Sequence, residues 1–339
     1  MFRIEKVYEA VSGYAVFRMR AESLEILVTN LGCRVLSIKM PDRNGTWNDI
    51  ILGLLDPEHP GEDGTYMGAV VGRVVNRIRG ASFDLNGRTY ALSGNDGRNH
   101  LHGGSQGFDK KMFTYLVQKD AISFGYKSPD MEEGYPGNLQ IVVTYRLEGN
   151  TFTFDCLALS DADTLVNISN HMYFNLSGRE TPIWDHSLMI AADCFLPIDE
   201  ESLPTGERRS VAGTAFDYRR SIQIAHRIDT QDAQIRKAHG YDHAFCLNRD
   251  RDQILLRHPE SGRQLRISTD CPMLHVYTGN FLSEGSSGKK GKPYDNWGGI
   301  ALEPELCPDS IHMENEPQVI LRKNKLYHTT TTYRFEVKE

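Results

Sequence analysis

Apolar and polar side chains alternate with a period of two over long stretches of the chain. Between residues 139 and 147 every odd position is apolar, and polar residues such as Gln140, Thr144 and Arg146 lie between them. After the turn signal at residues 148–150, the alternation resumes at positions 152, 154, 156 and 158. A period of two is typical of a strand with one buried face. The pattern therefore predicts a β-hairpin.

Further stretches predict strands in the same way. Residues 83–92 alternate around Asn86-Gly87, a dipeptide favoured in two-residue hairpin turns because both positions tolerate positive φ. Residues 254–268 predict another hairpin around a turn at Pro259–Gly262. The stretch Thr329–Val337, rich in Thr and aromatic residues, predicts a closing strand. Many strands at short spacing favour an antiparallel sandwich or barrel.

Helical patterns are few and short. Asp229–Ala238 is the best helix candidate, although a loop fits it equally well. A parallel fold would need amphipathic helices of 10–15 residues between strands, and this sequence lacks them. The segment Glu284–Pro293 (EGSSGKKGKP) is expected to be a mobile loop or a solvated turn. Since no shift of composition and no internal repeat marks a boundary, we expect one large β domain over residues 1–339.

Composition and charge narrow the class of protein. The chain of 339 residues is 40% hydrophobic, which argues against intrinsic disorder, and its net charge of −7 argues against a nucleic-acid partner. No apolar run approaches the roughly 18 residues of a membrane helix, and the charged N-terminus has no apolar signal core. The cysteines are scattered singly, as in reduced cytoplasmic proteins. We therefore expect a soluble cytoplasmic protein with a small partner.

The segment Gly68–Gly80 (GAVVGRVVNRIRG) is the first with candidate chemistry. It lacks the spacing of a phosphate-binding loop. Asn76 and Arg77 could donate hydrogen bonds to sugar hydroxyls, with Arg73 four residues before Arg77. Arginines on a solvated surface are the alternative.

The segment Asn95–Lys110 (NDGRNHLHGGSQGFDK) contains a His-x-His pair, His100 and His102. On a strand the two would share a face, which suggests a metal site, but no further ligand motif accompanies them. A polar contact at a loop edge is the alternative. The following Gly103-Gly104 pair would let backbone approach a ligand closely.

Three other segments carry isolated ionisable groups. His171 stands in NISNHMYFNL and could be a core histidine or a functional one. Asp242 and His243 are adjacent, so on a strand only one of them can face a pocket. Glu303 ends an apolar strand before a proline and is a candidate for a raised pKa or a general base, or else an edge residue that reaches solvent.

Taken in order, these segments resemble the aldose 1-epimerase (galactose mutarotase) family. The matching segments are GRVVNRI at 72–78, LHGGSQGFDK at 101–110, EGYPG at 133–137, NHMYFNL at 170–176, DCFLPID at 193–199, PTG at 204–206, GTAFD at 213–217, GYDHAF at 240–245, YTGNFL at 277–282, and LE at 302–303 with PD at 308–309. They extend from about residue 28 to the end of the chain, so the resemblance is more specific than any single motif.

The resemblance implies a large antiparallel β-sandwich that interconverts the α and β anomers of free aldoses such as galactose and glucose. It implies no cofactor and no metal. Glu303 falls at the catalytic base and His171 at the catalytic acid, and we expect Glu303 ionised and His171 protonated at neutral pH. The implied sugar contacts are Asn76, Arg77, His102, Asp242 and His275. The expected partner is a monosaccharide, not a nucleic acid or membrane, and the expected assembly is a monomer or homodimer.

The sequence departs from the family pattern at Glu305 and His275, where glutamine is common, and at His312, where asparagine is expected. These changes leave the catalytic pair intact and leave substrate preference open. A non-catalytic carbohydrate-binding protein, a glycosidase with two carboxylates, and an epimerase for a phosphorylated sugar are alternatives. The last would need a cationic cluster, for which only Lys289, Lys290 and Lys292 are available on the loop.

Overall fold

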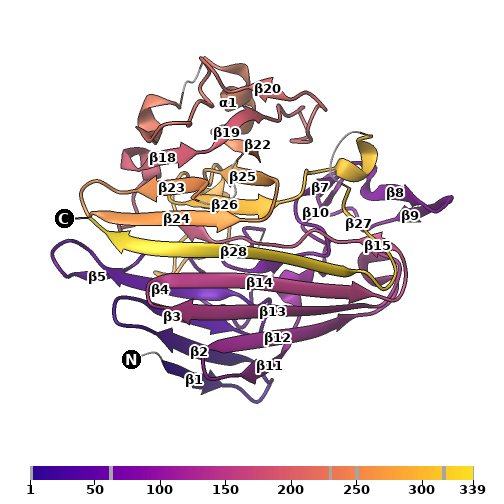
Figure 1. Cartoon of the computed structure of the whole chain (residues 1–339), viewed down its shortest axis with the longest axis horizontal. Helices are drawn as coiled ribbons and strands as arrows, with labels where there is room; N and C mark the ends of the chain where they lie inside the picture. Colours follow the sequence, from indigo (N-terminus) through magenta and orange to yellow (C-terminus); the bar gives the residue numbers. More distant parts are fainter. Residues whose placement is uncertain (1–2, 61–63, 229–230, 249–251, 315–317, 339) are drawn as a thin grey trace.

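The computed structural model describes residues 3–60, 64–228, 231–248, 252–314 and 318–338. Its largest element is a nine-stranded antiparallel sheet. In spatial order the strands are β11 (Thr114–Val117), β12 (Ala121–Ser128), β13 (Leu139–Glu148), β14 (Thr151–Ser160), β28 (Leu326–Val337), β24 (Arg263–Thr269), β23 (Ile254–Arg257), β18 (Ser187–Ile190) and β21 (Ile222–Gln223). These strands run side by side across the molecule (Figure 1).

Two further sheets complete the sandwich. A six-stranded sheet has the order β17 (Tyr173–Phe174), β26 (Ile300–Glu305), β25 (Met273–Tyr277), β22 (Asp242–Leu247), β19 (Ala192–Phe195) and β20 (Arg209–Ser210). A five-stranded sheet has the order β1 (Arg3–Glu9), β2 (Ala15–Arg20), β3 (Glu25–Thr29), β4 (Val35–Pro41) and β5 (Trp47–Asp49). The main apolar core joins all three sheets, with Phe17 of β2, Phe124 of β12 and Leu274 of β25 among its members.

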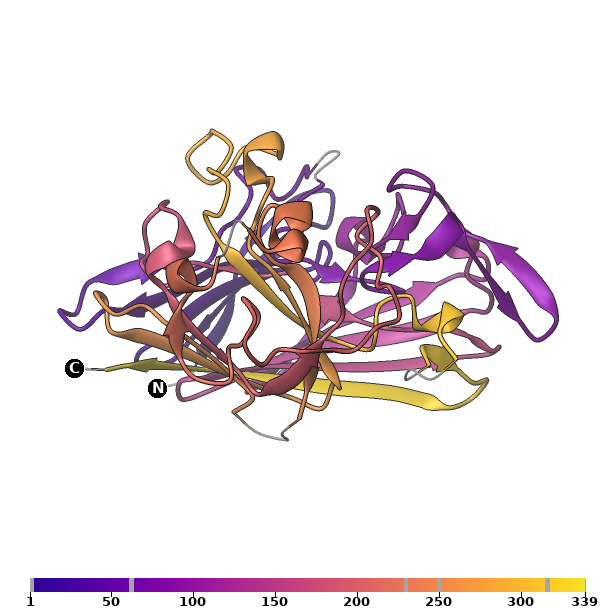
Figure 2. The same cartoon turned by 90° about the horizontal axis from the view of Figure 1, so that it is seen from above.

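Short elements connect the sheets. The two-stranded pairs are β7 (Arg77–Ile78) with β10 (His100–Leu101), β6 (Val70–Val71) with β16 (Ser169–Asn170), β8 (Ser82–Leu85) with β9 (Arg88–Ala91), and β15 (Thr164–Leu165) with β27 (Ile320–Leu321). Helical segments are α1 (Ala233–Ala238) and the 3₁₀ turns η1 (Arg79–Ala81), η2 (Phe108–Lys110), η3 (Glu132–Gly134), η4 (Ile183–Asp185), η5 (Ile224–His226), η6 (Leu282–Glu284) and η7 (Ser310–His312). Figure 2 shows α1 and the long loops on one side of the large sheet. Within the described ranges, no helix has the length and apolar character to span a membrane.

The predicted hairpins are confirmed. β13 and β14 pair from Leu139–Ser160 to Glu148–Thr151, and β13 buries its odd-numbered residues. Asn86 and Gly87 join β8 to β9 with φ values of 52° and 77°, as a tight hairpin turn requires. The antiparallel sandwich predicted from the period of two is therefore the observed fold, whereas the C-terminal strand lies in the middle of the large sheet rather than closing its edge.

One local prediction differs from the structure. The helix α1 begins at Ala233, because the Asp232 carboxylate accepts hydrogen bonds from the backbone N–H groups of Gln234 and Ile235 and caps the helix there. Residues 229–230 of the predicted helix lie outside the described residues. The segment 284–293, expected to be a mobile loop or a solvated turn, carries an ion pair of 2.7 Å between Lys289 Nζ and Asp49 Oδ2 of β5.

Candidate active site

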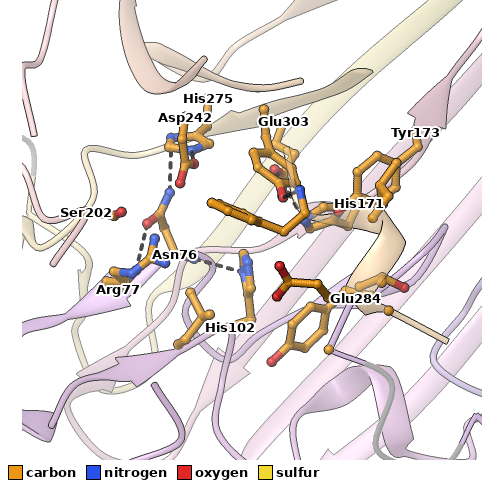
Figure 3. A pocket seen from close by; sticks show the side chains of 18 of the residues that line it. Asn76, Arg77, His102, His171, Tyr173, Ser202, Asp242, His275, Glu284 and Glu303 are labelled. Atoms are coloured by element: carbon orange, nitrogen blue, oxygen red, sulfur yellow. Dashed lines mark hydrogen bonds and ion pairs between the residues drawn. The ribbon is translucent and has the colours of Figure 1, made fainter. Parts of the chain in front are cut away.

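A cleft of about 570 Å³ opens beside the six-stranded sheet, and it contains all the side chains predicted as site residues. Its lining includes Asn76, Arg77, His102, His171, Asp242, His275 and Glu303, together with Tyr66, Tyr173, Ser202, Tyr277, Phe281 and Glu284. Figure 3 shows them converging from several strands and loops. Residues more than 200 positions apart in the chain therefore meet at one place.

Strand register explains why the carboxylates and His275 share the cleft. His275 on β25 is the cross-strand partner of Glu303 on β26, and Tyr277 is the partner of Asp242 on β22. Cross-strand partners project to the same face of a sheet. The opposite face carries residues such as Leu302, which belong to the main core. One face of this sheet thus builds the sandwich and the other face builds the site.

The adjacent residues Asp242 and His243 separate as predicted. Asp242 faces the cleft, while His243 packs on the Phe216 ring and contacts Gln234 Oε1 at 3.1 Å on the other side of the strand. The two residues follow the alternation of a β-strand. His243 is therefore a structural histidine.

Glu303 and His171 form a buried pair in the cleft. His171 Nε2 lies 3.6 Å from Glu303 Oε1, and the two side chains are only 5% and 1% exposed. Among the described residues, neither His171 Nδ1 nor Glu303 Oε2 has a hydrogen-bond partner. Both residues line the cleft, so a ligand bound there would lie against the pair.

Burial sets the protonation of this pair. It lowers the pKa of His171 to about 3 and raises the pKa of Glu303 well above its ordinary value. Both shifts disfavour the charged side chains. They oppose the expected ionised Glu303 beside a protonated His171, because burial removes solvent from both groups, whereas the raised pKa of Glu303 agrees with the prediction for a carboxyl group at the end of an apolar strand.

Aromatic rings hold His171 in place. The Tyr66 ring stacks at 6.1 Å between ring centroids, and the Tyr173 ring lies at 4.8 Å. The His102 ring approaches edge-on at 5.3 Å. The His171 imidazole plane is thus fixed by packing on several sides. Tyr173 and Tyr277 lie inside the quoted motifs although neither was predicted as a site residue, whereas Tyr66 has no sequence signal.

His102 and His100 do not form a metal pair. His102 has φ of 51°, outside the β region, and its Nδ1 accepts a hydrogen bond of 3.1 Å from the Asn76 backbone N–H. His100 instead contacts the Tyr135 hydroxyl and the Ser93 carbonyl, both at 2.7 Å, away from the cleft. The expectation that the two histidines share a face is wrong because the chain turns between them. Within the described ranges, no group of three or more His, Cys, Asp or Glu is arranged to hold a metal ion.

The glycines after His102 serve the fold. A Cβ on Gly103 would lie 1.7 Å from the Gly72 carbonyl oxygen, and one on Gly104 would lie 2.1 Å from the Glu133 carboxylate. The close approach expected for a ligand is therefore an approach of the protein's own chain. It places His102 in the cleft.

The guanidinium groups near Asn76 have separate roles. Arg77 lines the cleft, and its Nε donates a hydrogen bond of 2.7 Å to Asp96 Oδ2. Arg73 is 2% exposed and donates to Ser128 and to backbone carbonyls outside the cleft. Arg77 is therefore placed to meet a ligand, whereas Arg73 supports the fold.

A second polar chain runs along the cleft floor. His275 Nε2 lies 2.7 Å from Asp242 Oδ1, and its Nδ1 lies 3.1 Å from Asn76 Nδ2. Burial alone would raise the pKa of Asp242, but the hydrogen bond with His275 outweighs it and holds the pKa at about 2. Asp242 is therefore a fixed negative charge that can accept hydrogen bonds from hydroxyl groups.

The remaining departures from the family pattern lie apart from the cleft surface. Glu305 is fully buried and follows Glu303 on β26, but it is not among the lining residues. His312 pairs with Asp309, with 2.6 Å between His312 Nδ1 and Asp309 Oδ1, and it does not line the cleft. Of the three departures, only His275 meets the cleft directly.

The fold and the site define a β-sandwich protein with a polar cleft in which a buried carboxyl group and an imidazole lie side by side. A family model described as aldose 1-epimerase matches residues 15–334. The chain therefore belongs to the aldose 1-epimerase family. Its function is that of a mutarotase, an isomerase acting on carbohydrates.

Individual relatives match this chain over more than nine tenths of their length. Galactose mutarotase from Mus musculus is 40% identical over 325 residues, covering 95% of this chain and 94% of the mouse protein. Aldose 1-epimerase from Escherichia coli K12 is 38% identical over 318 residues and 91% of each chain. Among solved structures, an aldose epimerase homologue from C. elegans has a TM-score of 0.88 at 26% identity, with 100% of both chains covered. Galactose 1-epimerase from Lactobacillus acidophilus has a TM-score of 0.86 at 28% identity, again over 100% of both chains.

Proposed function

We propose that the protein interconverts the α and β anomers of free aldoses such as galactose and glucose, with Glu303 as general base and His171 as general acid. The observation that carries this proposal is the buried carboxyl–imidazole pair in the cleft lining, with 3.6 Å between His171 Nε2 and Glu303 Oε1. Ring opening of an aldose needs one group that accepts a proton and one that donates a proton. The pair supplies both.

The chemistry requires the pair to hold one proton. With that proton on His171, Glu303 removes the proton of the C1 hydroxyl, and the electron pair of that O–H bond forms the C1 carbonyl. The C1–O5 bond breaks toward O5, which takes the proton from His171. Rotation about C1–C2 presents the other carbonyl face, and closure returns both protons by the reverse transfers.

Burial of the pair affects the proton transfers before and after ring opening. Once the ring is open, Glu303 carries the proton and His171 is neutral, which is the distribution that the raised and lowered pKa values favour. The same distribution is favoured while the closed ring is bound, so placing the proton on His171 costs free energy. Contacts that are stronger in the transition state than with the bound pyranose must recover this cost.

Sugar hydroxyls fit the remaining lining. Asp242 accepts hydrogen bonds, while Arg77 and His102 donate, and His102 is neutral because burial lowers its pKa. Aromatic rings such as Tyr173 and Phe281 can cover the apolar face of a pyranose. The role of these groups is to hold C1 and O5 against the proton-transfer pair.

An unphosphorylated sugar is favoured by the charges around the cleft. Arg77 is the one Lys or Arg among the described lining residues, and it is already paired with Asp96. Lys289 and Lys290, considered above for phosphate binding, pair with Asp49 and Glu180 instead. No cationic cluster in the described lining would neutralise a phosphate.

Polarimetry of a pure galactose anomer tests the proposal. Each positioned acid or base contributes about 10²–10⁴-fold, so Glu303→Gln and His171→Asn should each slow anomer equilibration by about that factor. Circular dichroism and thermal melting would verify that both variants fold. Wild-type rates in both folded variants would contradict the assignment. An active wild type would also exclude a binding protein without catalysis.

We further propose that residues 1–339 act as a single domain, without cofactor, as a cytoplasmic monomer or homodimer. Support comes from the cleft, which draws on residues from positions 64 to 303. Light scattering coupled to gel filtration would determine the assembly. Full activity after dialysis against a chelator is the expected result for catalysis without metal.

A further inference from the structure

Glu305 is a buried carboxyl group directly behind the sugar cleft. It follows Glu303 by two positions on β26, so both side chains leave the same face of the sheet. Its Oε1 lies 3.4 Å from Asn76 Nδ2 and 3.5 Å from His275 Nδ1. Asn76 and His275 line the cleft and Glu305 does not. Glu305 therefore contacts the cleft lining through these two neighbours.

The hydrogen bonds of Asn76 define its orientation. Its Oδ1 accepts a bond of 2.8 Å from the Arg77 backbone N–H, so its Nδ2 points toward Glu305 and His275. One proton of Nδ2 is directed at His275 Nδ1, 3.1 Å away, which must then carry a lone pair. His275 consequently carries its proton on Nε2 and donates it to Asp242. The two Nδ2 protons of Asn76 and the Nε2 proton of His275 then each have an acceptor.

The surroundings of Glu305 oppose a negative charge. The ionisable groups that act on it or face it are Glu303 on its own strand, Asp242 on β22, and Cys271 and His275 on or beside β25. Its burial and the nearby Glu303 raise the pKa of Glu305 well above its ordinary value. Its Oε2 is buried without a hydrogen-bond partner among the described residues.

We propose that Glu305 is a positioning residue for the sugar cleft and that it works as a neutral acid, holding Asn76 and His275 in their sugar-binding orientation until it ionises. The proposal rests on the sugar-binding function proposed above. A carboxylate at 3.5 Å would face the lone pair of His275 Nδ1, and two acceptors repel each other. Movement of the His275 ring away from the carboxylate relieves this repulsion, but Asn76 Nδ2 then loses its acceptor. Ionisation of Glu305 thus rearranges the cleft without touching the sugar.

Binding of a sugar analogue across pH tests this role. The probe is 1,5-anhydrogalactitol, which lacks the C1 hydroxyl and cannot open, and its Kd would be measured by calorimetry from about pH 6 to pH 10. Glu305→Gln keeps the shape of the side chain and cannot ionise. Glu284→Gln is the matched control, because Glu284 lines the same cleft but is exposed.

In the wild type, Kd should rise by about tenfold for each pH unit above the pKa of Glu305, since only neutral Glu305 holds Asn76 and His275 in their sugar-binding orientation. This rise should be absent in Glu305→Gln and should persist in Glu284→Gln. An identical pH dependence in the wild type and Glu305→Gln would overturn the proposal. Failure of the wild type to bind the analogue at any pH would instead overturn the proposed sugar function, and this inference with it.

Carbon-13 NMR supplies a readout that is independent of the sugar. In protein labelled at the glutamate carboxyl carbons, the resonance that disappears in Glu305→Gln belongs to Glu305. We expect this resonance to remain at the protonated position at neutral pH. A carboxylate chemical shift at that pH would show that Glu305 is charged in the folded protein and would overturn the proposal even if the variant altered binding.

Discussion

Replacing Asp242 by asparagine removes the charge that holds His275 in the cleft. The Asp242 side chain is 17% exposed, and its Oδ1 lies 2.7 Å from His275 Nε2. Its pKa of about 2, against an ordinary value of 3.8, corresponds to about 2 kcal/mol in favour of the folded protein. Because asparagine still offers an oxygen acceptor to His275, the expected loss in Asp242→Asn is about 1–2 kcal/mol at neutral pH.

The stability difference between wild type and Asp242→Asn should decrease as the pH falls. A carboxylate whose pKa is depressed by folding stabilises the protein above its unfolded pKa and loses that effect as pH falls through its folded pKa. The difference in unfolding free energy between wild type and Asp242→Asn should therefore be constant from pH 7 to about pH 5. It should shrink below about pH 4 and be nearly absent close to pH 2.

Urea unfolding followed by tryptophan fluorescence measures this difference. Glu284→Gln is again the control, because an exposed carboxylate at the cleft should leave stability within about 0.5 kcal/mol at every pH. Equal stabilities of wild type and Asp242→Asn at neutral pH would refute the reasoning. So would a difference that stays unchanged as the pH approaches 2, because the effect would then not come from the charge.

Other perturbations test the acid, the core and the turn beside the cleft. Because burial holds the pKa of His171 at about 3, kcat/KM in polarimetry should stay level from pH 7 to about pH 5, whereas a fall centred near pH 6.5 would indicate a solvated imidazole. Tyr145→Phe removes a buried hydroxyl that accepts from Asn170 Nδ2 at 3.2 Å, so urea unfolding should show a loss of about 1–3 kcal/mol with kcat retained; an unchanged midpoint would contradict this. Gly103→Ala places a Cβ 1.7 Å from the Gly72 carbonyl at a φ of 89°, and we expect a lower melting temperature together with reduced activity, an outcome that a wild-type melting curve would exclude.

Strands and turns were predictable where the residues that determine them all lie within one short segment. The alternation over residues 139–158 specifies a hairpin because every second side chain must leave water. The Asn86-Gly87 turn is equally local. The candidate chemistry of Glu303 and His171 came from motif resemblance, and strand register explains how Glu303 and His275 come to face the same cleft.

The pKa shifts of the site residues and the identity of their contact partners were not predictable from local segments. The apolar strand before Glu303 suggested a raised pKa, but only the folded chain shows that Glu303 and His171 are buried side by side and that burial lowers the pKa of His171. His100 and His102 are two residues apart yet face different surroundings, because the chain leaves the β conformation at His102. The Gly103-Gly104 pair likewise accommodates neighbouring chain segments, which no local pattern reveals.

The sequence by itself determined the strands, their hairpins and the residue types available for proton transfer, because these depend on side-chain period and on chemistry within a few positions. Only the tertiary structure decided which of those groups meet and what charge they carry. Glu305 illustrates the division: its identity is visible in the sequence, but its contact with Asn76 brings together segments 229 residues apart. Burial is a property of that assembled surrounding, so the electrostatics of the site follow from the fold rather than from the motif.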